Sequence, residues 1–152
     1  MSKRILFVYP NTGSGYSFHP SIQLLSALAK QKGWETKLLH LHEKYGLPND
    51  PNLLILMAKE YNPRIVAFTS TDFEYTWVEQ LVRKMKDSMP DVLFLLGGKS
   101  AIEGKDLTKS AFDVFCVGEA EIPFLDLLDR LENGKNYSDI KSMWFKVGGS
   151  VV

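Results

Sequence analysis

The sequence contains little cysteine, no excess of charge and no long hydrophobic run. Because Cys116 is its single cysteine, the chain cannot form an internal disulfide, and we expect a reducing, cytoplasmic compartment. Lysine plus arginine and aspartate plus glutamate number 18 each, so we expect no nucleic-acid partner and no anionic membrane partner. The first apolar run ends at Pro10, far short of the roughly 20 residues of a membrane span.

Short apolar runs recur along the chain, and helical patterns separate them. They are continuous rather than alternating, which is typical of parallel strands buried on both faces. The chain length suits one domain. We therefore predict an α/β, flavodoxin-like (Rossmann-like) fold: a five-stranded parallel sheet of order 2-1-3-4-5 with helices on both faces. The predicted strands are Ile5–Tyr9, Thr36–Leu41, Arg64–Thr69, Val92–Leu96 and Phe112–Val117.

The end of the chain has a different pattern. Met143–Val147, followed by Gly148-Gly149 and Val151-Val152, predicts a small β-hairpin. We expect residues 1–140 to form the α/β domain and residues 141–152 to begin a hairpin or linker towards a further domain. On this interpretation the chain is the N-terminal part of a longer protein.

Loops rich in small residues follow the predicted strands. In open α/β sheets, ligands bind outside the carboxyl ends of the strands, near the point where the strand order reverses. Glycine allows close backbone approach there, and hydroxyl groups offer hydrogen bonds. This pattern favours a hydrogen-bonding grip on a large ligand, and we assign no catalytic residue and no metal ligand. The predicted binding residues are Thr12, Gly13, Ser14, Gly15, Ser70, Thr71, Gly97, Gly98, Ser100, Gly118 and Glu119.

These loops depart from the common nucleotide-binding motifs. The stretch from Gly13 lacks the third glycine of a dinucleotide fingerprint, since Phe18 stands in its place. Lys99 follows the wrong glycine pattern for a phosphate-binding Walker loop. An FMN site of the flavodoxin type, using hydroxyls and glycines around Thr12–Ser17, stays open.

Histidine and cysteine offer few candidates for chemistry. His40 and His42 could face the same way, but no cysteine or carboxylate stands near them at a familiar metal-ligand spacing. His19 lies in the first loop, either in contact with a ligand or as a partly exposed loop residue. Cys116 follows Phe115 in an apolar run, which favours core packing over nucleophilic chemistry.

Three segments in order carry a family resemblance: NPRIVAFTS, PDVLFLLGGKSA and FDVFCVGEAEIPFLDLLDRLENGK. Together they resemble the N-terminal cobalamin-binding domain of cobalamin-dependent radical S-adenosylmethionine enzymes, over nearly all of the chain to about residue 147. The resemblance implies a corrinoid over the carboxyl edge of the sheet, with its nucleotide tail in the crevice. Ser70 and Thr71 would meet the tail, Gly97-Gly98 would let it pass, and Thr12–Ser17 would lie beside the corrin.

Departures from the family pattern qualify that expectation. Lys99-Ser100-Ala101 replaces the Pro-His-Ala that often follows the paired glycines in this family. The chain also has no Asp-x-His-x-x-Gly, the motif that supplies a cobalt-ligating histidine in methionine-synthase-type domains, so the resemblance implies base-off cobalamin without a protein ligand to cobalt.

The catalytic half of such an enzyme is not in these residues. Radical chemistry of this kind needs three cysteines at Cys-x-x-x-Cys-x-x-Cys spacing, and this chain has one. The resemblance therefore implies that a 4Fe–4S cluster and S-adenosylmethionine belong to a missing domain of the same polypeptide, with methyl transfer or related radical chemistry there. Two alternatives stay open: an FMN-binding redox domain, and an interaction domain of this fold that has lost its ligand.

Two glutamates stand where the fifth strand gives way to the last helix. Glu119 and Glu121 fall near the predicted helix start, where carboxylates are favoured by the positive end of the helix dipole, typically by ~0.3–1 kcal/mol. No histidine or metal-ligand partner stands nearby in the sequence. We therefore interpret them as shaping the helix start or the rim, with direct cofactor contact by Glu119 or Glu121 as the alternative.

Overall fold

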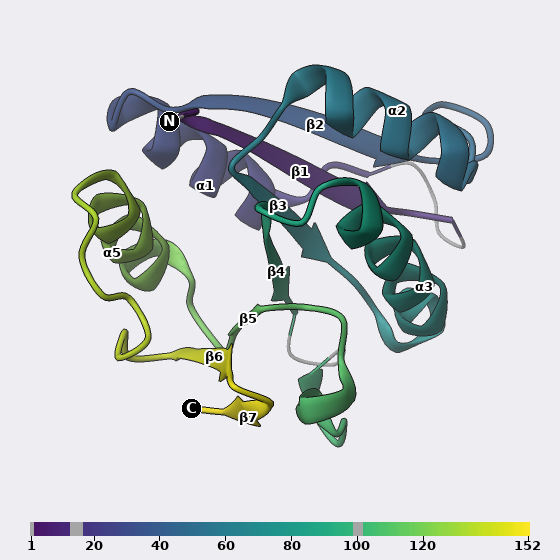
Figure 1. The fold of residues 1–152 in the computed structure, drawn as a ribbon. Coiled ribbons are helices and arrows are strands. Elements are labelled where there is room, and N and C mark those ends of the chain that lie inside the picture. The colour runs from purple at the N-terminus through teal and green to yellow at the C-terminus, as the bar shows by residue number, and fades with distance from the viewer. Residues whose placement is uncertain (1, 13–16, 99–101) are drawn as a thin grey trace.

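Strands and helices alternate along most of the chain, as the apolar runs predict (Figure 1). The computed structural model describes residues 2–12, 17–98 and 102–152. In chain order the elements are β1 (Arg4–Pro10), α1 (Pro20–Gln31), β2 (Glu35–Leu41), α2 (Pro51–Tyr61), β3 (Ile65–Thr69), α3 (Asp72–Ser88), β4 (Leu93–Gly97), η1 (Leu107–Lys109), β5 (Val114–Cys116), α5 (Glu121–Glu132), β6 (Met143–Val147) and β7 (Ser150–Val151).

The sheet is larger and more mixed than the sequence predicts. Its strand order is β2-β1-β3-β4-β5-β6-β7. The first five pair in parallel in the predicted order 2-1-3-4-5, but β6 pairs antiparallel with β5. The prediction of a purely parallel, five-stranded sheet is therefore wrong at this edge. The predicted hairpin does form, and its first strand joins the sheet because the apolar side chains of Met143 and Phe145 are buried against it.

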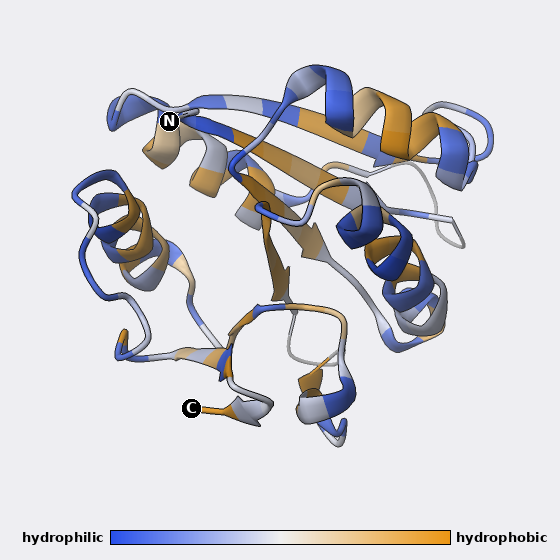
Figure 2. Ribbon diagram, in the orientation of Figure 1, coloured by the Kyte–Doolittle hydropathy of each residue, from blue (hydrophilic) through white to orange (hydrophobic). Residues whose placement is uncertain are grey.

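Helices cover both faces of the sheet. α1 and α5 pack side by side on one face, and α2 and α3 pack side by side on the other (Figure 1). Each face has its own buried apolar cluster. The central strands are largely hydrophobic, while the helices combine hydrophobic and hydrophilic residues (Figure 2). This is the layered α/β arrangement that continuous apolar strands require.

The ends of the helices follow local sequence signals. The Asp50 carboxylate accepts hydrogen bonds from the backbone N–H groups of Asn52 and Leu53, which caps α2. Asn62 then ends that helix in the left-handed conformation. Pro20 occupies the first turn of α1, where its missing N–H costs no helix hydrogen bond. Because α1, α3 and α5 each follow a strand of the parallel sheet, their starts lie at its carboxyl edge.

The segment before β5 differs from its sequence pattern. Its polar residues suit a short helix, and the structure has the short 3-10 turn η1 there. The Asp106 carboxylate accepts the backbone N–H of Thr108, a local bond that competes with helix formation. The buried Glu79 carboxylate of α3 also accepts the N–H of Ala111 at 2.7 Å, which ties this segment to α3. Among the described residues, no helix is both long enough and apolar enough to cross a membrane.

Candidate functional site

A pocket of about 390 Å³ opens at the carboxyl edge of the sheet, between α1, α5 and the strands. Its size lies within the roughly 300–1,000 Å³ of ordinary small-molecule sites. Residues at the ends of β3, β4 and β5 and the first turns of α1 and α5 line it. The pocket therefore lies where ligands bind in open α/β folds.

Strand register sets the depth of this pocket. Phe7, Ala67 and Leu95 are in register on β1, β3 and β4, and they form the lower row of its wall. Because side chains alternate along a strand, the next row on this face lies two residues on, about 7 Å nearer the carboxyl edge. That upper row contains Thr69, Gly97, Cys116 and Met143, also in register. Gly97 has no side chain and Ala67 has a methyl group, so the centre of the wall is hollow.

The helix walls change character with depth in the same way. α1 contributes exposed Ser21 at its start and half-buried Leu25 one turn further on. On α5, Glu121 stands at the first turn and Phe124 lies buried one turn deeper. Both helices start at the mouth of the pocket and run inward, so their first turns meet solvent and their second turns meet the sheet. The pocket is thus polar at its mouth and apolar at its base.

One imidazole lies at middle depth. His19 Nε2 is 3.2 Å from Thr69 Oγ1, and the His19 ring packs edge-on against Tyr9. Burial lowers the pKa of His19 below its usual 6.5, so the ring is neutral at neutral pH. Its Nδ1 is buried and has no hydrogen-bond partner among the described residues. His19 therefore belongs to the pocket wall, and its contact with a ligand stays a prediction.

The single thiol also faces this pocket. Cys116 is 3% exposed, which agrees with the prediction of a packing residue, and it lines the wall beside Gly97. Burial, together with the nearby Glu121 carboxylate, raises the pKa of the Cys116 thiol from its ordinary 9.0 to about 11. The group is therefore protonated at neutral pH and acts as a small, weakly polar surface.

Gly98 marks a close approach between the ends of β3 and β4. Its φ of +107° is a conformation that side-chain-bearing residues rarely adopt. A Cβ at this position would lie 3.0 Å from the Ser70 carbonyl oxygen, closer than normal packing allows. The glycine therefore lets the backbones of Gly98 and Ser70 approach closely at this edge of the pocket.

The predicted binding residues divide into distinct groups. Gly97, Gly98, Gly118 and Glu119 line the pocket. Ser70 is buried beside Gly98, with its hydroxyl donating to the Thr71 carbonyl, and Thr71 starts α3, where the Glu74 carboxylate accepts its backbone N–H at 3.0 Å. Thr12 is half-buried after β1. Gly13, Ser14, Gly15 and Ser100 lie outside the described residues.

Sequence reasoning missed the apolar part of the wall. The apolar lining residues, none of which the sequence motifs single out, include Ala67, Leu95, Leu25, Phe124 and Met143. Their period-2 and period-3.6 spacing does identify the face that they share. The useful signal was the small residue Ala67 within an otherwise bulky apolar run. No group of three or more histidine, cysteine or acidic side chains in the described ranges is arranged to hold a metal ion.

Comparison with known proteins places this geometry in context. A family model described as "B12 binding domain" matches residues 12–128. A search of curated proteins finds no match.

Solved structures share the fold. The radical S-adenosylmethionine methyltransferase TsrM from Kitasatospora setae, with tryptophan substrate and a S-adenosylmethionine analogue bound, superposes with a TM-score of 0.80 at 16% identity, over 99% of this chain and 30% of that one. The cobalamin-dependent radical enzyme OxsB gives 0.76 at 12% identity, over 99% of this chain and 22% of that one. A cobalamin-binding protein from Desulfitobacterium hafniense gives 0.59 at 14% identity, over 88% and 59%. The chain spans less than a third of the length of the two radical enzymes.

Proposed function

The chain belongs to the B12-binding domain family, and from this premise we propose that it is the corrinoid-binding module of a radical S-adenosylmethionine enzyme. In this proposal the corrin ring lies over the carboxyl edge of the sheet. Its nucleotide tail enters the pocket between α1 and α5. The module binds and orients the cofactor, and the chemistry takes place in a further domain of the same polypeptide.

The change of polarity with depth carries this proposal. A nucleotide tail ends in a flat heterocycle and continues through a sugar and a phosphate to the corrin, so it is apolar at its tip and polar along its stem. The pocket offers Phe7, Leu95 and Phe124 at its base. Its mouth offers Ser21, Glu119 and Glu121. An amphipathic ligand of this kind therefore fits tip first.

The glycines of the upper row fit a ligand that passes close to the backbone. A Cβ on Gly97 would meet one atom within 4 Å, at 3.8 Å, so the space in front of it is open. Gly98 offers its backbone at the pocket edge, where any side chain would be strained. The carboxylates of Glu119 and Glu121 accept hydrogen bonds, which suits the hydroxyl and amide donors of a corrinoid rather than its phosphate.

The same geometry supports base-off binding. Phe7, Leu95 and Phe124 would hold a heterocycle that enters between α1 and α5, and a base held there would not be available to cobalt. His19 is engaged with Thr69 in the pocket wall, which fits with a cobalt that has no protein ligand from this chain. When bound, the corrinoid supplies methyl-transfer or related radical chemistry.

Reconstitution tests the proposal. Hydroxocobalamin titrated at about 50 μM into the 152-residue chain should bind, giving a base-off visible spectrum and a calorimetric heat. Gly97→Val fills the hollow without backbone strain and should weaken this binding. Thr76→Val introduces the same residue at an exposed position of α3 and should leave corrinoid binding unchanged. No binding by either method would contradict the proposal, and FMN binding with flavin fluorescence would favour the flavodoxin alternative instead.

The proposal of a catalytic partner domain has a separate test. The coding sequence downstream of Val152 should contain a Cys-x-x-x-Cys-x-x-Cys motif. The likeness of this chain to less than a third of each radical enzyme supports that expectation. Absence of the motif, together with corrinoid binding, would leave a corrinoid-binding module that works with a separate partner protein.

A further inference from the structure

The base of the pocket carries no side-chain hydrogen-bonding atom among the described residues. Phe7, Ala67 and Leu95 form its sheet side. Leu25 and Phe124 form its helix sides. The strand backbone there is already hydrogen-bonded in the parallel ladders between β1, β3 and β4. A ligand group that reaches this depth therefore meets hydrocarbon only.

The few polar side-chain atoms within the pocket lie nearer the mouth. Thr69 belongs to the upper row, about 7 Å above Ala67, and its hydroxyl is engaged with His19. Cys116 lies in that same row and is protonated at neutral pH, because burial raises the pKa of its thiol to about 11. Hydrogen bonding is thus available at the stem of an inserted tail and not at its tip.

This separation discriminates between the heterocycles that end corrinoid tails. In dimethylbenzimidazole the ring edge farthest from the ribose carries two methyl groups, which gain from apolar burial. In adenine that edge carries an amino group and a ring nitrogen. Buried in hydrocarbon, these groups lose their hydrogen bonds to water without replacement.

We propose that the pocket selects corrinoids by their lower base, favouring dimethylbenzimidazole over adenine through the hydrocarbon base formed by Phe7, Ala67, Leu95 and Phe124. This selectivity rests on the proposed corrinoid-binding function and specifies its ligand. Ala67 is the size-determining residue, because its methyl group lies between the bulky Phe7 and Leu95 and leaves room for the ring tip.

Three corrinoids distinguish this selectivity from the function itself. Calorimetric titrations would compare a corrinoid with a dimethylbenzimidazole tail, one with an adenine tail, and cobinamide, which has no lower base. The first should bind about tenfold to a hundredfold more tightly than the second. A preference below threefold, or a preference for adenine, overturns the selectivity while corrinoid binding stands. If none of the three binds, the proposed function itself is wrong.

A matched pair of alanine-to-serine substitutions tests whether Ala67 causes the preference. Ala67→Ser adds a hydroxyl to the hydrocarbon base at almost unchanged volume and should narrow the preference severalfold. Ala58→Ser makes the same change at a fully buried position of α2, on the opposite face of the sheet, and should leave the ratio unchanged. Equal effects of the two substitutions would overturn the assignment of Ala67.

Ala67→Leu gives an independent measurement. The added carbons fill the space for the ring tip, so the affinities of both tailed corrinoids should fall to that of cobinamide. Cobinamide affinity, which needs no tail pocket, should not change, and it reports on folding in the same titration. Full retention of dimethylbenzimidazole binding by this variant would show that the tip lies elsewhere and overturn the inference.

Discussion

The two faces of the sheet are made by alternate residues of the same strands, yet one is closed and the other is hollow. On the α2–α3 face, Val8, Phe68, Leu96 and Phe115 stand in register, and every one of them is large. On the α1–α5 face, the row one residue further on reads Thr69, Gly97 and Cys116. Small residues in one row thus open a pocket, without any change in the backbone arrangement.

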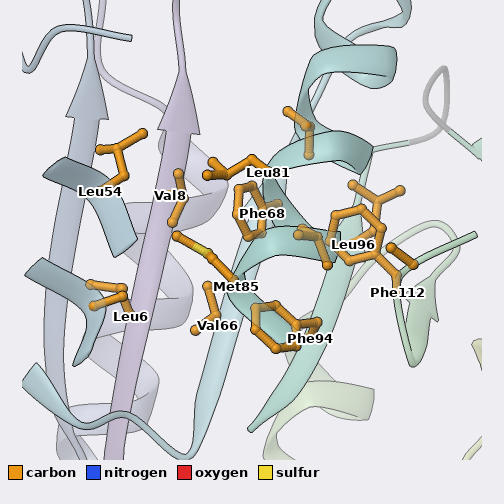
Figure 3. Close-up of a cluster of buried hydrophobic side chains, with 14 of the residues drawn as sticks. Leu6, Val8, Leu54, Val66, Phe68, Leu81, Met85, Phe94, Leu96 and Phe112 are labelled. Atoms are coloured by element: carbon orange, nitrogen blue, oxygen red, sulfur yellow. The ribbon is translucent and has the colours of Figure 1, made fainter. Parts of the chain in front are cut away.

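The closed α2–α3 face has the close side-chain packing that the pocket side lacks. Phe68 and Phe94 of the strands and Leu81 and Met85 of α3 belong to one buried cluster there (Figure 3). Phe68 and Phe112 pack edge to face at 5.5 Å between ring centroids. The hollow face keeps comparable packing only below the pocket. The α2–α3 side is therefore closely packed at the level where the α1–α5 side has a pocket.

The largest loss of stability is expected when a side chain is truncated on the closed α2–α3 face. Phe94 is fully buried, so Phe94→Ala should lower the free energy of unfolding by about 3–5 kcal/mol in urea denaturation. Leu25→Ala, on the half-buried pocket wall, should cost less than half as much, because its side chain already borders open space. Equal losses at the two sites would contradict the division of roles between the faces.

A smaller effect is expected where the pocket edge depends on glycine. Gly98→Ala should destabilise the fold by about 2 kcal/mol, since a positive φ is strained for alanine and its Cβ would press on the Ser70 carbonyl. Gly104 also has a positive φ, but a Cβ at that position would meet nothing within 4 Å, so Gly104→Ala should cost about 1 kcal/mol. Thermal or urea unfolding of both variants measures the difference, and equal costs would remove the close approach as a cause.

The fold could be predicted from sequence because its strands are continuous apolar runs. Ile65–Thr69 and Leu93–Gly97, for instance, contain few residues that suit any exposed element. The antiparallel edge could not be predicted in the same way. The alternation in Met143–Val147 indicates a strand, but which edge it pairs with depends on contacts with Val114 and Cys116 that no local pattern specifies.

The site was predictable in its glycines and not in its walls. Gly97 and Gly118 were expected at the carboxyl edge because turns and close approaches need them. Leu25 and Phe124 have the spacing of ordinary helix core residues, and they become pocket residues because Ala67 and Gly97 opposite are small. A void is a property of several strands in register, so single-chain periodicity does not reveal it.

The buried thiol on the pocket side makes the free energy of unfolding depend on pH. Since the pKa of Cys116 is raised from 9.0 to about 11, the unfolded chain loses this proton at lower pH than the folded protein. Stability from the protonated thiol is therefore present below about pH 9 and is lost as pH rises towards 11, by about 1–2 kcal/mol. Urea denaturation from pH 8 to pH 11 should show this loss relative to Cys116→Ala, which removes the group. Parallel pH profiles for the two proteins would mean that the thiol ionises freely in the pocket.

The smallest change in stability is expected at the mouth of the pocket. Glu119 is exposed beside the start of α5, so Glu119→Gln should change the free energy of unfolding by no more than about 0.5 kcal/mol. Corrinoid affinity should change by less than about threefold, because an exposed carboxylate and an amide oxygen both accept hydrogen bonds from the ligand in competition with water. Calorimetric titration with hydroxocobalamin measures the affinity. Glu43→Gln, at an exposed position just after β2 that does not line the pocket, provides the matched charge change. A loss beyond tenfold for Glu119→Gln alone would instead make this carboxylate a principal contact, since the helix-start role that the sequence favours requires no ligand at all.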